Sequence, residues 1–118
     1  MSVRFVTKEI HAYLDYPVAI ALFALPFVLG LGQSNPLALW LSVATGIAAL
    51  ILTVLTDHHL GVIKVLSYKF HLTVDLLVGL TFIVAPLILK FAGLDAMYYW
   101  ANGIAVLIVV SLHKPEAA

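Results

Sequence analysis

Four long apolar stretches, separated by short polar breaks, divide the chain. They cover residues 12–31, 37–56, 72–92 and 96–112. Because about 20 helical residues cross the hydrocarbon layer of a bilayer, each stretch suits a membrane-spanning helix, although the last is rather short. The breaks at residues 32–36 and 93–95 have the composition of tight turns. The pattern therefore predicts an all-α protein of two antiparallel helix hairpins, packed as a four-helix bundle.

Two further segments mix apolar and charged residues at helical spacing. One is residues 2–14, ahead of the first span, and the other is residues 60–70, ahead of the third. Such a pattern favours a short amphipathic helix at the level of the lipid headgroups. We expect both segments to lie along the membrane surface.

The second half of the chain repeats the first. Residues 3–31 align without a gap with residues 63–91, at a constant offset of 60. The identical pairs are His11 with His71, Asp15 with Asp75, Val18 with Val78, Pro26 with Pro86 and Leu29 with Leu89. Polar residues have little reason to recur in apolar segments by chance. The alignment therefore predicts two tandem two-helix repeats, about residues 3–59 and 63–114, related by a pseudo-twofold axis along the membrane normal.

Composition agrees with a membrane protein and excludes several other classes. Hydrophobic residues make up 64% of the 118 residues, against about half in soluble domains, and charged residues make up 10%. We therefore expect one membrane domain over residues 1–118, with the lipid bilayer as its main partner. The formal net charge of zero gives no basic patch for nucleic acid. Cysteine is absent, so disulfides and thiolate metal ligands are excluded.

The distribution of basic residues predicts the orientation. Five of the six Lys and Arg residues fall on the side that holds both termini and the central connection, and only Lys90 falls on the other. The five are Arg4, Lys8, Lys64, Lys69 and Lys114. Because cytoplasmic loops are enriched in Lys and Arg, we expect an inner-membrane protein with both termini in the cytoplasm.

Each repeat opens with His-x-x-x-Asp, formed by His11 and Asp15 in the first copy and by His71 and Asp75 in the second. Residues four apart on a helix share a face, and the pseudo-twofold axis brings the two pairs together if both point inward. The remaining histidines end the second and fourth spans, at the same membrane boundary; they are His58, His59 and His113. These seven residues are the candidate metal ligands.

The chemistry of this set allows two kinds of cofactor. Imidazole and carboxylate ligands suit zinc, iron, manganese, nickel or copper(II). Alternatively, each Asp orients a His, and the histidines alone ligate a metal or a haem iron, with His11, His71, His58 and His113 as candidates. Either cofactor implies a redox or metal-handling role, and the sequence does not decide whether the protein is an enzyme.

Two other functions stay open. Asp15, followed by Pro17, is typical of a helix N-cap, which would leave His11 outside the helix and its ring solvated. The protein would then be a structural module, whose small-residue pairs such as Ser42 and Gly46 pack the second span against the fourth or form a homo-oligomer. The third possibility is a proton or ion pathway that uses Asp15 and Asp75.

The second copy carries a motif with a family resemblance. The motif consists of His71, Asp75, Gly79 and Pro86, followed by a span with Trp100 and Gly103. With this motif the chain resembles the SPW-repeat membrane proteins of bacteria and archaea. The tripeptide that names the family corresponds to Leu25-Pro26-Phe27 and Ala85-Pro86-Leu87. The resemblance implies one or two copies of a two-helix unit and, since no settled activity goes with the family, little about function.

Overall fold

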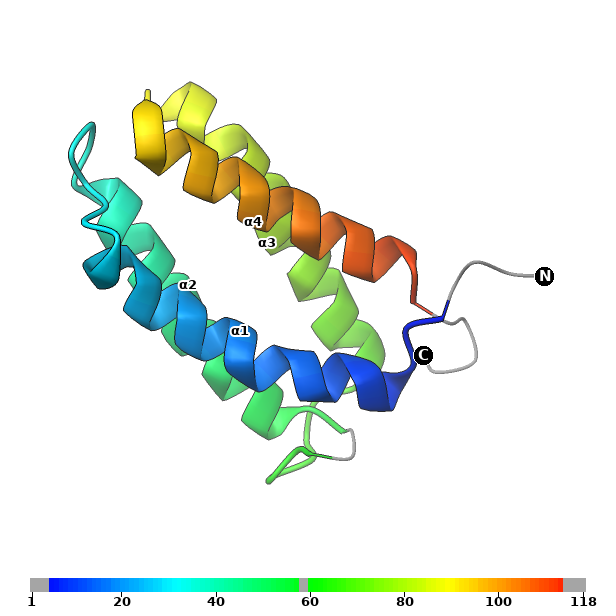
Figure 1. Ribbon diagram of the computed structural model, residues 1–118. Coiled ribbons are helices and arrows are strands. Elements are labelled where there is room, and N and C mark those ends of the chain that lie inside the picture. Colours follow the sequence, from blue (N-terminus) through cyan, green and yellow to red (C-terminus); the bar gives the residue numbers. More distant parts are fainter. Residues whose placement is uncertain (1–4, 58–59, 114–118) are drawn as a thin grey trace.

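The computed structural model describes residues 5–57 and 60–113, and these residues form four helices (Figure 1). The helices are α1 (Lys8–Val28), α2 (Leu37–Leu55), α3 (Tyr68–Ile88) and α4 (Gly93–Ser111). All four are long and apolar enough to cross a membrane, and the described residues form no strand beyond two isolated bridges. The predicted all-α membrane fold is confirmed.

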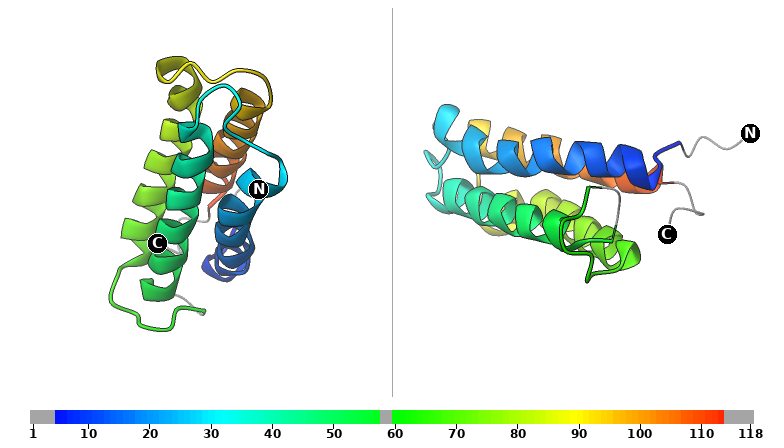
Figure 2. Two further views of the ribbon diagram at one scale, coloured as in Figure 1. Left: turned by 90° about the vertical axis from the view of Figure 1, so that its left-hand side faces the viewer. Right: turned by 90° about the horizontal axis from the view of Figure 1, so that it is seen from below.

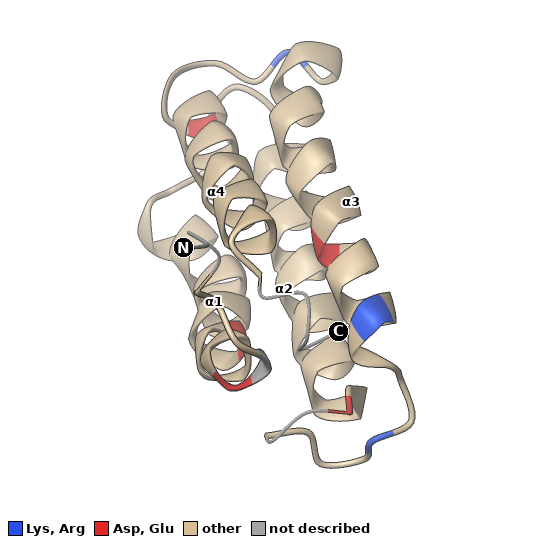
Figure 3. Cartoon of the chain, turned by 90° about the vertical axis from the view of Figure 1, so that its right-hand side faces the viewer, with Lys and Arg blue, Asp and Glu red and all other residues tan. Residues whose placement is uncertain are grey.

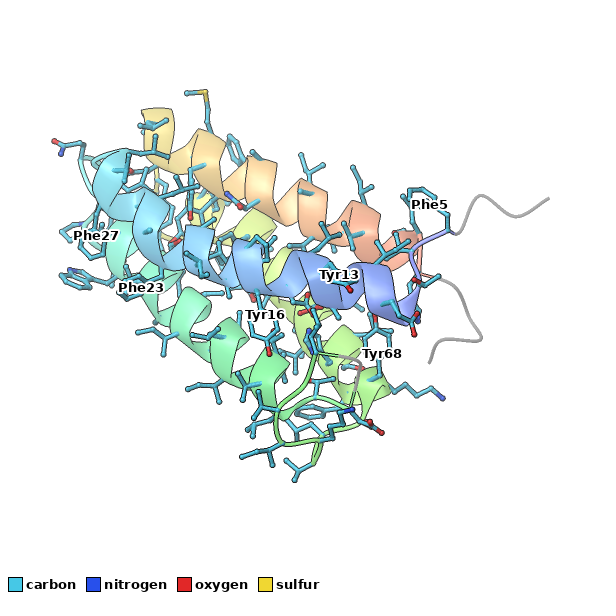
Figure 4. All side chains as sticks on the ribbon, turned by 60° about the horizontal axis from the view of Figure 1, so that its bottom comes forward. Phe5, Tyr13, Tyr16, Phe23, Phe27 and Tyr68 are labelled. Atoms are coloured by element: carbon cyan, nitrogen blue, oxygen red, sulfur yellow. The ribbon has the colours of Figure 1, made fainter. Side chains whose placement is uncertain are left out.

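The helices pack tightly in two pairs, α1 with α2 and α3 with α4, and the pairs contact one another less closely. Figure 2 shows the two hairpins side by side, with the four axes roughly aligned. Apolar side chains cover the outside of this bundle. Phe23 and Phe27, which are 45% and 52% exposed, point away from it (Figure 4). This outer surface is suited to lipid.

Helices α1 and α3 begin four residues earlier than the predicted spans. The side chain of Thr7 caps α1 by accepting a hydrogen bond from the Ile10 N–H at 3.1 Å, and Ser67 caps α3 through the Phe70 N–H at the same distance. The prediction of separate surface helices at residues 2–14 and 60–70 is wrong for the described residues, because residues 5–7 and 60–67 are not helical. The helical spacing in these segments belongs to the first turns of α1 and α3.

Extended residues before each cap pair with the end of another helix. The Val6 N–H donates to the Leu112 carbonyl at 3.0 Å, and the Leu66 N–H donates to the Leu55 carbonyl at 2.8 Å. Each bond satisfies a carbonyl that a helix end leaves free. The two contacts are equivalent in the two repeats, but Leu112 follows Leu55 by 57 residues rather than 60. The second repeat is therefore shorter by three residues, and the shortening falls in the turn between α3 and α4, residues 89–92, against residues 29–36 between α1 and α2.

Small residues allow the close packing within each hairpin. A Cβ atom at Gly46 of α2 would lie 2.6 Å from the Phe23 backbone nitrogen of α1, and one at Gly103 of α4 would lie 3.0 Å from the Gly79 carbonyl oxygen of α3. Gly46 therefore packs against α1, not against the fourth span or a second copy as the small-residue pattern suggested. Such glycine contacts are common between membrane helices.

Ser42 connects three helices. Its hydroxyl donates to the Leu22 carbonyl at 2.9 Å, which is the carbonyl that Pro26 leaves without a helical partner. Because the Ser42 hydrogen is used in this bond, the Tyr98 hydroxyl, 2.7 Å away, donates to the Ser42 oxygen. The proline in α1 is thus accommodated by a neighbouring helix.

Asp95 joins the two hairpins at one end of the bundle. Its side chain, in the first turn of α4, accepts hydrogen bonds from the backbone N–H groups of Gly32 and Ser34 at 2.9 and 3.0 Å. Nearby, the buried Tyr99 donates its hydroxyl to the Ala38 carbonyl at 2.8 Å. These contacts tie α4 to the first hairpin at the end that holds the short turns.

The basic residues differ between the two ends of the bundle. Lys64 and Lys69 lie just before and within the first turn of α3, at the end where Val6 pairs with Leu112, and Lys90 lies in the turn between α3 and α4 at the opposite end. Figure 3 shows basic segments at both ends of the bundle. Arg4 and Lys114 lie outside the described residues. Lys64 and Lys69 thus lie at one end of the bundle and Lys90 at the other, which is the distribution from which the orientation was predicted.

Candidate metal centre

The early start of α1 and α3 puts both His-x-x-x-Asp motifs inside helices. His11 and Asp15 occupy successive turns of one face of α1, as His71 and Asp75 do on α3. The alternative in which Asp15 caps the first helix is wrong, because Thr7 is the cap and Pro17 lies inside α1.

The four side chains meet between the hairpins in a closed ring of contacts. His11 Nε2 lies 3.0 Å from Asp15 Oδ1 and 2.8 Å from Asp75 Oδ2. His71 Nε2 lies 3.2 Å from Asp15 Oδ2 and 3.3 Å from Asp75 Oδ2. Each histidine therefore contacts the carboxylate of its own repeat and that of the other repeat. Ligand atoms from the four residues all lie within 4.8 Å of one another.

These dimensions fit a small metal ion. For zinc, ligand distances of about 2.0 to 2.1 Å give a tetrahedron with edges of about 3.3 to 3.4 Å. The nitrogen-to-oxygen contacts in the ring are 2.8 to 3.3 Å, and all four ligand atoms lie within 4.8 Å of one another, so an ion at the centre requires some ligands to move outward and others inward. Two imidazoles and two carboxylates also match the ligand preference of the divalent first-row transition metals.

The ring is buried. The side chains of His11 and His71 are 4% and 2% exposed, and those of Asp15 and Asp75 are 12% and 21% exposed. Two carboxylates so close together in a membrane-spanning bundle need positive charge nearby, since an uncompensated charge within a membrane costs several kcal/mol. Either protons on the histidines or a cation among the four side chains must supply it.

Thr56, the C-cap residue that follows α2, fixes the orientation of His71. Its hydroxyl lies 2.6 Å from the Leu52 carbonyl, which can only accept, so the single hydroxyl hydrogen is used there. The Thr56 oxygen must then accept the hydrogen bond from His71 Nδ1, at 2.7 Å. With its proton on Nδ1, a neutral His71 turns the lone pair of Nε2 toward Asp15 and Asp75, which is the arrangement of a metal-ligating histidine.

His11 lacks the equivalent bond. Val6 bridges His113 in the same way as Leu66 bridges Thr56, so His113 is the counterpart of Thr56 in the other repeat. His113 has no hydroxyl that could accept a hydrogen bond from His11 Nδ1. The buried Nδ1 atom of His11 has no hydrogen-bond partner among the described residues. The two histidines of the ring are therefore held differently.

Of the other predicted ligands, His113 lies near the ring but is not one of the four. It is 8% exposed, and its ring centroid is 5.1 Å from that of Tyr68. Tyr68, whose side chain reaches toward α1 in Figure 4, also contacts the rings of His11 and His71, at 5.7 and 6.1 Å. His58 and His59 lie outside the described residues.

Sequence reasoning missed Thr56 and Tyr68. Thr56 would have been found by aligning the second helices of the repeats at an offset of 57, which matches it with His113. Tyr68 has no such signal, because Lys8 occupies its place in the first repeat.

A cavity of about 300 Å³ begins at the ring and runs between the hairpins. His11, Asp15, His71 and Asp75 line one end, and apolar residues of all four helices line most of the remainder. The ring is thus accessible from a largely apolar space within the bundle.

A search of curated proteins and a search of solved structures each found no match to this chain. A family model did match, namely that of the SPW repeat domain, over residues 8–113. The match covers all four helices and both halves of the ring. The chain belongs to the SPW repeat domain family.

Proposed function

We propose that the protein binds one divalent transition-metal ion within the membrane, through His11, Asp15, His71 and Asp75. The observation that carries this proposal is the bond between Thr56 and His71, which holds the proton of a neutral His71 on Nδ1 and turns Nε2 toward two carboxylates. Without a positive charge at the centre, the carboxylates of Asp15 and Asp75 and the lone pair on His71 Nε2 would repel one another.

Charge balance favours a divalent ion. Two carboxylates carry two negative charges, so one M²⁺ ion makes the buried site neutral. Zinc, iron, manganese, nickel and copper(II) all accept such ligands. A single ion fits better than haem, because the four ligand atoms lie within 4.8 Å and the adjoining cavity of about 300 Å³ leaves little room for a porphyrin.

The site lies within the first turns of α1 and α3, close to one membrane boundary. From the sidedness of the lysines, this boundary is the cytoplasmic face of the inner membrane. A metal held there, next to an apolar cavity, suits a metal-handling or redox role at the inner leaflet.

Metal analysis of the purified protein tests the proposal. We expect about one transition-metal ion per chain by elemental analysis. In competition with a chelator, His71→Ala and Asp75→Asn should lower zinc affinity by more than the roughly 10-fold to 100-fold typical of losing a residue that only supports a ligand. The matched control is Asp57→Asn, which removes an exposed carboxylate at the same end of the bundle.

The competing explanation is a ring of ion pairs that only locks the hairpins together. In that case both imidazoles carry protons on both nitrogens, which nitrogen NMR of the side chains detects. Absence of bound metal, with equal and weak zinc binding by Asp75→Asn, Asp57→Asn and the unchanged protein, would overturn the proposal.

A further inference from the structure

The cavity that starts at the ring is elongated, and its ionisable residues lie at one end only. Its lining on α1 extends from His11 to Leu22, and its lining on α3 from His71 to Val78. At about 1.5 Å of rise per residue these segments are about 10 to 17 Å long. The cavity of about 300 Å³ is therefore elongated along the helix axes. A single extended alkyl chain has this shape.

Most polar groups in the walls of the cavity are hydrogen-bonded within their own helix. Thr45 and Thr53 donate their hydroxyl hydrogens to the carbonyls of Leu41 and Ala49, at 2.7 and 2.8 Å. Asn102 donates to the Tyr98 carbonyl in the same way, at 2.8 Å. Each polar wall residue thus satisfies a donor within its own helix. The remaining wall is largely apolar, and an apolar wall favours an apolar occupant.

The lining of the cavity includes exposed residues. Ala48 of α2 and Ala105 of α4 line it, and both are exposed residues on helices that span the membrane. The polar end lies near the membrane boundary, and the apolar part extends toward the middle of the bilayer. A lipid chain has the same orientation, with its head at the boundary and its tail pointing inward.

The charge of the ring determines which head group fits. The two carboxylates are balanced either by one divalent ion or by two protons, so the ring is neutral in both cases. A charged head group placed against it would be buried without compensation, which is unfavourable. A hydroxyl or carbonyl oxygen, in contrast, can ligate a metal or hydrogen-bond to the ring.

We propose that the cavity binds an uncharged single-chain amphiphile, such as a long-chain alcohol, with its polar head at the His and Asp ring and its alkyl chain between the hairpins. Because the ring is neutral with either a metal or protons, this inference does not depend on the metal site. Its failure would therefore leave the metal proposal untouched.

Fluorine NMR of n-dodecanol with a terminal trifluoromethyl group tests the proposal, with the protein in phosphatidylcholine nanodiscs. We expect a bound signal distinct from that of probe dissolved in the bilayer. Ala49→Phe and Ala105→Phe fill the cavity from two different helices, and each should abolish the bound signal. Ala44→Phe is the matched control, because Ala44 is exposed on α2 and does not line the cavity.

Two comparisons complete the test. Dodecanoate and dodecyltrimethylammonium, labelled in the same way, should give no bound signal, since their heads are charged. Circular dichroism shows whether each variant keeps its helices. Loss of the bound signal in Ala44→Phe as well, its persistence in both cavity variants, or equal binding of the charged probes would overturn the proposal, and so would the absence of a bound signal in the unchanged protein.

Discussion

Replacing Thr56 by Val tests the centre without touching a proposed ligand. Valine has nearly the same shape as threonine but cannot accept a hydrogen bond, so His71 Nδ1 loses the partner that lies 2.7 Å away. His71 is 1% exposed, and no water can readily replace the lost hydroxyl. The imidazole is then free to carry its proton on either nitrogen or to rotate.

The loss should weaken metal binding measurably. Removing the residue that orients a ligating histidine typically lowers metal affinity by about 10-fold to 100-fold, which corresponds to about 1.4 to 2.8 kcal/mol. The unpaired Nδ1 also destabilises the metal-free fold, because an unsatisfied buried donor costs about 1 to 3 kcal/mol. The weaker metal binding and the lower stability both result from the lost hydrogen bond of His71 Nδ1.

Thr53→Val is the matched control. Thr53 lies on the same helix, is 1% exposed and, like Thr56, donates its hydroxyl to the carbonyl four residues earlier. No hydrogen bond joins it to the ring of four. Zinc affinity from chelator competition, measured for both variants, should therefore fall only in Thr56→Val. Equal affinities for the two variants and the unchanged protein, with helices intact, would refute the assigned role of Thr56.

Three further predictions concern stability, measured by thermal unfolding in detergent. Lys90 has a left-handed backbone with φ of 58°, where the equivalent residue of the first repeat is Gly30, so Lys90→Gly should stabilise the protein by about 1 kcal/mol; no gain would contradict this. Asp95→Asn should cost about 1.5 to 3 kcal/mol, because a buried charged acceptor of hydrogen bonds from the other hairpin is lost. Gly46→Ala should cost about 1 to 3 kcal/mol, since its Cβ would meet the backbone of Phe23; an unchanged melting temperature would show that α1 and α2 can separate freely.

The bundle and the meeting of the four ring residues could both be predicted from the sequence, because the chain is duplicated. In a duplicated chain, a polar pair that recurs at the same place in both copies is repeated by the pseudo-twofold axis. His11 with Asp15 and His71 with Asp75 are one helical turn apart, so each pair faces one way. The hydrophobic pattern places both pairs at the starts of membrane-spanning helices, and so at the same end of the bundle.

The starts of α1 and α3 could not be predicted from the hydrophobic pattern. Mixed apolar and charged residues ahead of a span have the same periodicity whether they form a surface helix or the first turn of the span itself. The capping side chains of Thr7 and Ser67 decide between the two, and their hydrogen bonds were not readable from the pattern. Thr56 was missed because the shorter second turn changes the offset of the second helices.

The difference between Thr56 and His113 gives the two histidines of the ring different properties. His71 is held by a hydrogen bond to Thr56, whereas the Nδ1 atom of His11 has no such partner among the described residues. A ligand held by a second hydrogen bond loses less conformational freedom on binding a metal, and so binds it more firmly. In two identical units related by exact symmetry, both histidines would be held alike. In the proposed metal site, His71 would therefore anchor the ion, and His11 would be the ligand more easily displaced by an incoming molecule.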